Sequence, residues 1–363
     1  MTAMADPKEE LTRIRQALDD ADAALTEALD ARAHAARELA RLREQSPETY
    51  IELPRDHEVI AQAVERVKEF PRDAVQPVLR EVLSGCAALT SPIEVVYVGQ
   101  EGGFGHLAAR SQFGASASLR AVGDVEDVLS EVERDQASFG LVPFETSNDG
   151  AVTSSINLLA RGDAKICAEI PIRRTFDLIS RAGDRQSVAK IYASSSAIAA
   201  CEKHLQARYP GATIIDTRNG IVAAERAAAE PEAAALVTSL VAEQSELTPI
   251  ERGIEDVADL HTRYVAVGKD YPPRTGKDRT AVVVALHDAP GVLVDCLQPF
   301  ADRKINLFRL ETRPARGWEF PYLILFEVDG HITDRHVLTA IEELRGSSRY
   351  VKVLGSYPRV TEV

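Results

Sequence analysis

The chain has 363 residues, 45% of them hydrophobic and 27% charged, with a formal net charge of −14 at pH 7. This length predicts two or three domains with apolar cores of ordinary size. The acidic balance argues against a nucleic-acid partner, although a few arginines could still dominate one pocket for an anionic small molecule. No apolar run is long enough to span a membrane, and the start of the chain lacks the apolar core of a signal peptide.

The four cysteines are scattered along the chain and form no Cys-x-x-Cys pair; they are Cys86, Cys167, Cys201 and Cys296. This pattern is typical of reduced thiols, most of them buried, in a cytoplasmic protein. We therefore expect a cytoplasmic location and no metal site.

Residues 8–45 carry the pattern of one long helix, because apolar residues recur every three or four positions from Leu11 to Leu42. Such a helix is about 55 Å long at about 1.5 Å per residue, so it cannot bury its own apolar stripe. It needs shorter helices folded back on it, a partner chain, or both. Residues 56–69 and 72–90 are predicted to form two shorter helices. One interpretation of the long helix is a coiled-coil dimerisation arm.

The arginines of this segment point to a second interpretation. Arg32 and Arg43 are eleven residues apart, about three helical turns, so they share one face. Arginines on one helix face are usually solvated, but segment 1–92 resembles the all-helical chorismate mutase domain. The resemblance is carried by Ile14-Arg15, Asp30-Ala-Arg32, Arg43, Arg55 and Asp56. It implies an intertwined helical dimer with a pocket that holds a dicarboxylate.

The reaction implied by this resemblance suits arginine side chains. Chorismate rearranges to prephenate within one molecule, so the site needs no nucleophile. It needs cations that clamp two carboxylates in a compact conformer. Arg15, Arg32 and Arg55 would form this clamp, and Arg43 stands where the family usually has lysine.

From Ile93 onwards, predicted strands and helices alternate. The first strand, at 93–98, is followed by the glycine-rich stretch 99–106 and an alanine-rich helix. Such a turn suggests an anion site at a helix N-terminus, but it is not the Gly-x-Gly-x-x-Gly pattern of a dinucleotide site, and we expect no cofactor. Further strands are predicted at 139–144, 165–172, 190–193, 213–216 and 234–237, with a helix at 195–207. The pattern predicts an α/β domain of two lobes around a cleft.

A polar cluster follows the apolar run at 139–144, as is typical of a strand that delivers a loop to a cleft. With other motifs, this cluster makes residues 93–270 resemble the prephenate dehydratase domain. The motifs are Tyr97–His106, Val142-Pro-Phe-Glu-Thr-Ser147 with Gly150, Ile254-Glu-Asp256 and Thr262-Arg-Tyr264. The resemblance implies that Thr262 is the threonine on which catalysis depends.

Prephenate dehydratases expel carbon dioxide and a ring hydroxyl together, and aromatisation to phenylpyruvate drives the reaction. A threonine hydroxyl is a weak acid, so Thr262 would act mainly as a positioned hydrogen-bond donor to the departing hydroxide. Arg263 would either hold a substrate carboxylate or form a structural salt bridge. Glu145, Ser147 and Asn148 would line the opposite wall of the cleft.

After a linker with proline and glycine at 271–278, residues 277–363 show a βαββαβ order, which is a ferredoxin-like α+β sandwich. This segment resembles the ACT regulatory domain through Gly291-Val-Leu-Val294 and Glu311-Thr-Arg-Pro314. The resemblance implies that L-phenylalanine binds as an effector. The implied effector residues are Gly291, Val292, Leu293, Val294, Glu311, Thr312 and Arg313. A purely structural dimerisation module is the alternative.

The sequence thus predicts a multidomain enzyme of phenylalanine biosynthesis, namely a prephenate dehydratase under phenylalanine feedback that could also be a chorismate mutase. Several polar residues of the dehydratase family are replaced here; for example, Gly103 and Gly105 stand where the family has hydroxyl residues. Two alternatives therefore stay open: a non-catalytic sensor of an aromatic amino acid, and an enzyme with altered chemistry on prephenate. The helical arm and the ACT-like segment both suggest a homodimer or homotetramer.

Overall fold

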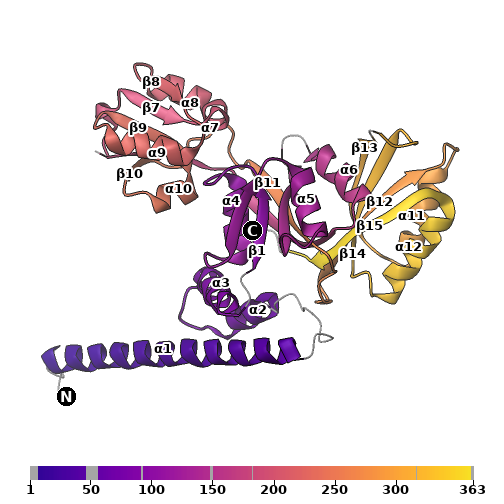
Figure 1. Ribbon diagram of the computed structural model, residues 1–363, viewed down its shortest axis with the longest axis horizontal. Helices are drawn as coiled ribbons and strands as arrows, with labels where there is room; N and C mark the ends of the chain where they lie inside the picture. The colour runs from indigo at the N-terminus through magenta and orange to yellow at the C-terminus, as the bar shows by residue number, and fades with distance from the viewer. Residues whose placement is uncertain are drawn as a thin grey trace, which may run out of the picture. The chain divides into compact units, whose positions relative to one another are not determined.

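The computed structural model describes residues 7–45, 56–90, 93–147, 150–181, 183–315 and 317–360, with only the backbone of 43–45 and 56–58. The chain divides into two compact units. Unit 1 comprises residues 1–93 and 113–117, and unit 2 comprises residues 94–112 and 118–363 (Figure 1). Within the described ranges, no helix is both long enough and apolar enough to cross a membrane.

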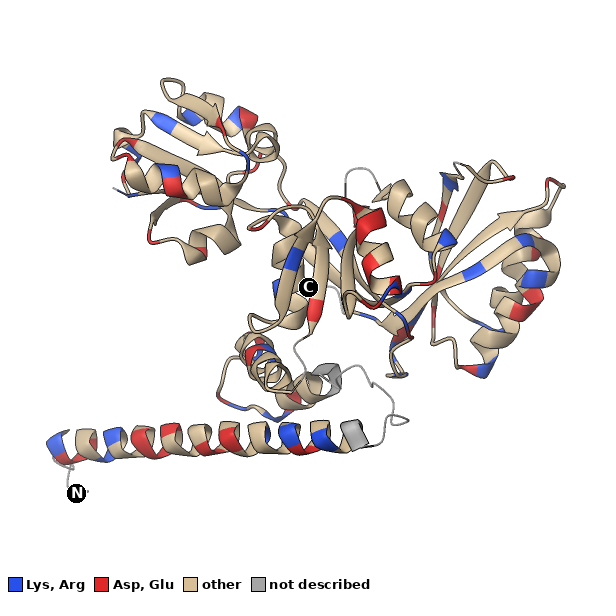
Figure 2. Ribbon diagram, viewed as in Figure 1, with Lys and Arg blue, Asp and Glu red and all other residues tan. Residues whose placement is uncertain are grey.

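Unit 1 is helical, as predicted. Its helices are α1 (Pro7–Gln45), α2 (Asp56–Arg66) and α3 (Arg72–Ala88), and α3 contains Pro77 without a break. Helix α3 buries Val75 and Leu83, whereas the apolar stripe of α1 stays open, with Leu18 and Leu25 each 60% exposed. Both signs of charge are distributed along α1 beside this stripe (Figure 2). The described part of the chain therefore leaves the stripe of α1 uncovered.

The first lobe of unit 2 is built on parallel and antiparallel strands. Its strands are β1 (Glu94–Val98), β2 (Ser118–Val122), β3 (Phe139–Thr146), β4 (Gly150–Ala151), β5 (Lys165–Arg173) and β11 (His261–Gly268). Its helices are α4 (Phe104–Phe113), α5 (Val125–Glu133) and α6 (Thr153–Arg161). Strand β1 runs parallel to β2 and β3, and β11 lies antiparallel between β3 and β5. This arrangement places the two predicted motifs, at the ends of β3 and β11, on neighbouring strands.

The second lobe is a separate sheet with the strand order β10-β6-β9-β7-β8. Its strands are β6 (Phe176–Ser180), β7 (Lys190–Ala193), β8 (Thr213–Asp216), β9 (Ala233–Thr238) and β10 (Thr248–Glu251). Its helices are α7 (Ser195–Ala200), α8 (Glu202–Arg208), α9 (Gly220–Ala229) and α10 (Ser239–Gln244), with a short 3-10 helix at Arg185–Ser187. The helix predicted at 195–207 is thus two helices, because the backbone of Cys201 leaves helical geometry at φ −122°.

The C-terminal segment has the predicted βαββαβ order. Its elements are β12 (Asp278–Leu286), α11 (Val292–Asp302), β13 (Leu307–Pro314), β14 (Tyr322–Asp329), α12 (Arg335–Ser347) and β15 (Ser348–Pro358). Both helices pack on one face of the sheet over a core that includes Val282, Phe300 and Ile341. The strand order in this part is β13-β14-β12-β15.

This C-terminal sheet continues into the first lobe. Strand β15 pairs with β5 at Gly355 and Ile166, which gives one sheet of ten described strands. One core joins the two segments, since Val265 and Phe144 belong to the same buried cluster as Val283 and Leu325. A Cβ atom on Gly355 would overlap the Cβ and carbonyl oxygen of Ile166. Only glycine at this position lets the two backbones approach.

Gly355→Ala is therefore expected to lower the free energy of unfolding of unit 2 by about 1–3 kcal/mol, as overpacking does in other cores. Gly346→Ala on α12 is the matched control, because no atom lies within 4 Å of the added Cβ. Alanine there should leave stability unchanged or raise it by about 0.5–1 kcal/mol, through helix propensity. Urea denaturation measures both values, and equal stability of the two variants would contradict the role of Gly355.

Candidate active site

The ends of β3 and β11 are held together by a defined register. Thr262 lies opposite Thr146, and Arg263 lies opposite Glu145. Beyond this pairing, the N–H of His261 donates to Oγ of Ser147 at 3.1 Å, and the N–H of Ser147 donates to the carbonyl of His261 at 3.0 Å. Asn148, the remaining predicted residue of this loop, lies outside the described residues.

Adjacent residues of a strand point to opposite faces of the sheet, so Thr262 and Arg263 face different surroundings. Thr262 is only 5% exposed, and its face also carries Thr146, the residue directly across on β3. Sequence reasoning noted Thr146 as polar but did not name it as a site residue. Its place beside Thr262 depends on the pairing register, which the sequence does not reveal.

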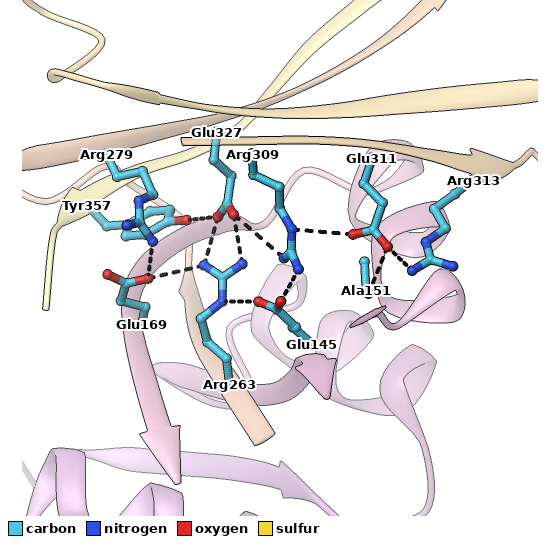
Figure 3. Close-up of polar contacts among 10 residues, drawn as sticks. All are labelled: Glu145, Ala151, Glu169, Arg263, Arg279, Arg309, Glu311, Arg313, Glu327 and Tyr357. Carbon is cyan, nitrogen blue, oxygen red and sulfur yellow. Dashed lines mark hydrogen bonds and ion pairs between the residues drawn. The ribbon is translucent and has the colours of Figure 1, made fainter. Parts of the chain in front are cut away.

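Arg263 is enclosed by carboxylates of three strands (Figure 3). Its Nε donates to Glu145 at 2.9 Å, and its Nη1 donates to Glu169 at 3.1 Å. Glu327 of β14 accepts two further bonds, at 2.7 Å from Nη1 and 2.8 Å from Nη2. Glu327 is fully buried and also accepts from the hydroxyl of Tyr357 at 2.8 Å. Of the two roles considered for Arg263, the geometry supports the structural salt bridge.

The contacts continue along β13. Arg309 pairs with Glu145, and its Nε lies 3.3 Å from Glu311. Glu311 pairs with Arg313 and accepts a hydrogen bond from the N–H of Ala151 at 3.2 Å. Glu145 is thus shared between Arg263 and Arg309, and it lies on the face opposite to Thr262.

We call this group the ion cluster. Its members are Glu145, Glu169, Arg263, Arg279, Arg309, Glu311, Arg313 and Glu327 (Figure 3). Arg279 joins it through Glu169 at 2.8 Å. The four positive and four negative charges cancel, which is what makes their burial tolerable.

Ionisation within the cluster follows from its opposite charges. Burial acts to raise the pKa of Glu327, but the guanidinium of Arg263 and the hydroxyl of Tyr357 outweigh it, and the pKa is lowered. Burial acts to lower the pKa of Arg263, but Glu327 and Glu145 raise it above the ordinary arginine value. Both groups are therefore charged at neutral pH.

The glycine-rich stretch forms a turn that His106 closes. The N–H of Gly102 donates to Nδ1 of His106 at 3.0 Å, and the imidazole stacks on Tyr97 with ring centroids 5.3 Å apart. Burial is the main cause that lowers the pKa of His106, which suits the role of its Nδ1 as an acceptor. Thr238, at the end of β9, donates to the carbonyl of Gly102 at 2.6 Å and ties the second lobe to this turn.

The remaining predicted residues lie in other parts of the fold. Arg15 is exposed and Arg32 is half-buried on α1, whereas Arg55 and the side chain of Arg43 lie outside the described residues.

Gly291 precedes α11 with a φ of 82°, and Leu293 and Val294 are exposed on the first turn of this helix. Val292 is half-buried beside them, and Thr312 is exposed on β13 between Glu311 and Arg313 of the ion cluster. In the described part of the chain, no cluster of His, Cys, Asp or Glu is arranged to hold a metal ion.

Comparison with known families gives three matches in chain order. Residues 14–90 match chorismate mutase type II, residues 95–272 match prephenate dehydratase, and residues 280–346 match the ACT domain. The bifunctional chorismate mutase/prephenate dehydratase of Aquifex aeolicus is 31% identical over 97% of this chain and 98% of its own length. The chain belongs to the bifunctional chorismate mutase/prephenate dehydratase family. This confirms the family that the sequence motifs predicted.

Other relatives agree with this assignment. The bifunctional protein of Pseudomonas aeruginosa is 30% identical over 98% of this chain and 99% of its own length. Among solved structures, a prephenate dehydratase from Arthrobacter aurescens in complex with L-Phe is 31% identical, with a TM-score of 0.62 over 73% of this chain and 90% of its own. A Staphylococcus aureus prephenate dehydratase, 24% identical with a TM-score of 0.62 over 73% of this chain and 100% of its own, shows the fold alone.

The ion cluster predicts a large effect of removing one buried charge. Glu327→Gln should lower the free energy of unfolding of unit 2 by about 3–5 kcal/mol, because it leaves Arg263 partly unpaired in the core. Glu319→Gln, the same change at an exposed position, should alter it by less than about 0.5 kcal/mol. Chemical denaturation followed by circular dichroism measures both, and a loss below about 1 kcal/mol in Glu327→Gln would contradict the role of this pair.

Proposed function

We propose that unit 2 converts prephenate into phenylpyruvate, carbon dioxide and water, with Thr262 as the hydrogen-bond donor to the departing hydroxide. The observation that carries this proposal is the paired end of β3 and β11, where buried Thr262 lies beside Thr146 and the two strand ends are tied by Ser147. A hydroxyl held in a water-poor, fixed position is worth far more to a developing charge than one in solvent. The family membership of the chain supports the same reaction.

The chemistry needs few protein groups. The bond from the ring to its carboxylate breaks, the electron pair enters the ring, and the hydroxyl on the opposite carbon leaves as hydroxide, which takes a proton from solvent to become water. Thr262 is proposed to act on the substrate, and Ser147 is proposed to hold the end of β3 beside it through the N–H of His261. Arg263 and Glu145 are proposed to hold these strand ends in place, because their charged groups pair with each other. Positioning and hydrogen bonding, rather than proton transfer by a strong acid, then supply the rate enhancement.

The proposed effector is L-phenylalanine, bound by Gly291–Val294 and Glu311–Arg313. An amino acid offers an ammonium group, a carboxylate and here an aromatic ring. Exposed Leu293 and Val294 suit the ring, and Glu311 and Arg313, which pair with each other here, would exchange that pair for the ammonium group and the carboxylate of the ligand. The L-Phe complex of the Arthrobacter aurescens relative supports this choice of ligand.

For unit 1, we propose that a second copy of the chain covers the stripe of α1, and that the dimer rearranges chorismate to prephenate. The support is the row of exposed apolar residues on one helix, Leu11, Ile14, Leu18 and Leu25 among them, each at least 45% exposed. A contiguous apolar stripe of this length marks an interaction surface. Arg15 and Arg32 on the same helix, with Arg43 and Arg55, are the proposed clamp for the substrate carboxylates.

Removing the hydroxyl of Thr262 tests the dehydratase proposal. Thr262→Val keeps the volume and β-branching, and should lower kcat for prephenate by about 100-fold or more, the usual loss for one donor to a developing oxyanion. Thr262→Ser should retain most of the activity because it keeps the hydroxyl. The assay follows phenylpyruvate, with chorismate turnover as a check on unit 1. If wild-type protein binds L-phenylalanine but turns over neither substrate, the protein is a sensor instead.

A charge in the stripe of α1 tests the mutase proposal. Leu25→Glu should abolish dimer formation through unit 1 and reduce chorismate turnover by at least about 10-fold, because burying an unpaired carboxylate is costly. Prephenate turnover by unit 2 should be retained. Glu27→Gln, at an exposed polar position on the same helix, is the control. Light scattering and the two assays give the readouts, and full mutase activity in a monomeric variant would disprove the proposal.

A further inference from the structure

Prephenate carries two carboxylates, and the cation expected to hold one of them is already occupied. Four of the five N–H donors of Arg263 are taken by Glu145, Glu169 and Glu327. Its guanidinium also lies on the face of the sheet opposite to Thr262. A substrate on the Thr262 face therefore needs another cation.

Arg174 lies on that face, directly after β5. Its N–H donates to the carbonyl of Leu260 at 2.7 Å, which extends the pairing of β5 with β11 beyond the last residue of the strand. Ile172 is paired with Thr262, so its side chain lies on the face of Thr262. Arg174 is two residues further along the chain, so its side chain lies on that face as well.

The electrostatics of a tyrosine on the same face agree with this placement of Arg174. Tyr264 is two residues after Thr262 on β11, so it shares the face of Thr262. Burial raises the pKa of Tyr264 to about 12, and the positive charge of Arg174 acts in the opposite direction. The positive charge of Arg174 therefore acts on a residue two positions from Thr262, in agreement with the strand register.

An aromatic ring also contacts the guanidinium of Arg174. Its guanidinium carbon lies over the ring of Phe104, 5.4 Å from the centroid, and Phe104 belongs to the end of the glycine-rich stretch. The ring is itself fixed edge-on by Phe176, at 5.2 Å. A guanidinium over an aromatic face keeps its in-plane N–H donors available for a carboxylate.

Within the described ranges, Arg174 is partly exposed as a residue, and its guanidinium has no carboxylate partner and makes no side-chain hydrogen bond. The adjacent Arg173 differs, because it is exposed and lies 3.1 Å from Asp259. A guanidinium that is held in place without a protein anion is available to a ligand carboxylate. We propose that Arg174 binds a carboxylate of prephenate, an inference that rests on the proposed dehydratase function.

The two carboxylates of prephenate are not equivalent for this purpose. The ring carboxylate loses its negative charge as it departs as carbon dioxide, so a cation bound to it would stabilise the substrate more than the transition state and slow the reaction. The pyruvyl carboxylate keeps its charge throughout and remains in phenylpyruvate. Arg174 therefore binds the pyruvyl carboxylate.

The test compares Arg174→Gln with Arg173→Gln, the same substitution at the neighbouring residue. Arg174→Gln should raise KM for prephenate by about 10- to 100-fold, as expected for losing a charged hydrogen bond, with kcat changed by less than about threefold because the interaction is equal in ground and transition states. The constant for inhibition by phenylpyruvate should rise by a similar factor. Arg173→Gln should leave both constants within about twofold of wild type.

Each outcome separates this inference from the proposed function. If wild-type protein makes phenylpyruvate and Arg174→Gln shows unchanged constants, only the inference about Arg174 is overturned. A raised KM with unchanged phenylpyruvate inhibition overturns the assignment to the pyruvyl carboxylate. If wild-type protein makes no phenylpyruvate, the dehydratase proposal fails, and calorimetric titration with prephenate still decides whether Arg174 binds it. Should Arg174→Gln fold poorly, Arg174→Lys, which keeps the charge without the planar fork, should show a smaller loss in the same direction.

Discussion

The arrangement of unit 2 depends on the guanidinium of Arg263. It donates to Glu145 of β3, Glu169 of β5 and Glu327 of β14, and so joins strands that are far apart in the chain. A buried carboxylate without its cation would be unstable, so each of these strands is constrained to lie where its carboxylate can reach the same arginine. The dehydratase-type and ACT-type segments are therefore held together by charge as well as by their shared apolar core.

This interaction separates the roles of two adjacent residues. Because a strand alternates its side chains, the residue that holds the interface, Arg263, and the residue proposed for catalysis, Thr262, face opposite sides of one sheet. A change at the interface can therefore reach the catalytic face through the backbone of β11 and the β3 end that pairs with it. Glu145, shared between Arg263 and Arg309, connects this strand end to Glu311 in the proposed effector segment.

Some features could be read from sequence because they depend on local patterns. The long helix from Pro7 follows from its apolar spacing, and the βαββαβ order after Asp278 follows from alternating strands and helices. The break at Cys201 was missed, because the residues on both sides of it favour a helix and nothing local marks the change. The sequence also did not predict the pairing of β15 with β5, since a single glycine does not indicate which distant backbone it will contact.

The family, the order of the three segments and the residue types available for chemistry follow from the sequence, because motifs and hydrophobic periodicity are properties of the chain alone. Which of these residues meet depends on the packing of distant strands. This packing placed Thr146 beside Thr262, committed Arg263 to protein carboxylates and left Arg174 beside Phe104 on the face of Thr262. These outcomes depend on strand register and on which face of a sheet a side chain occupies. A register shift of one residue would move each side chain to the opposite face of the sheet, and the local sequence does not indicate the register.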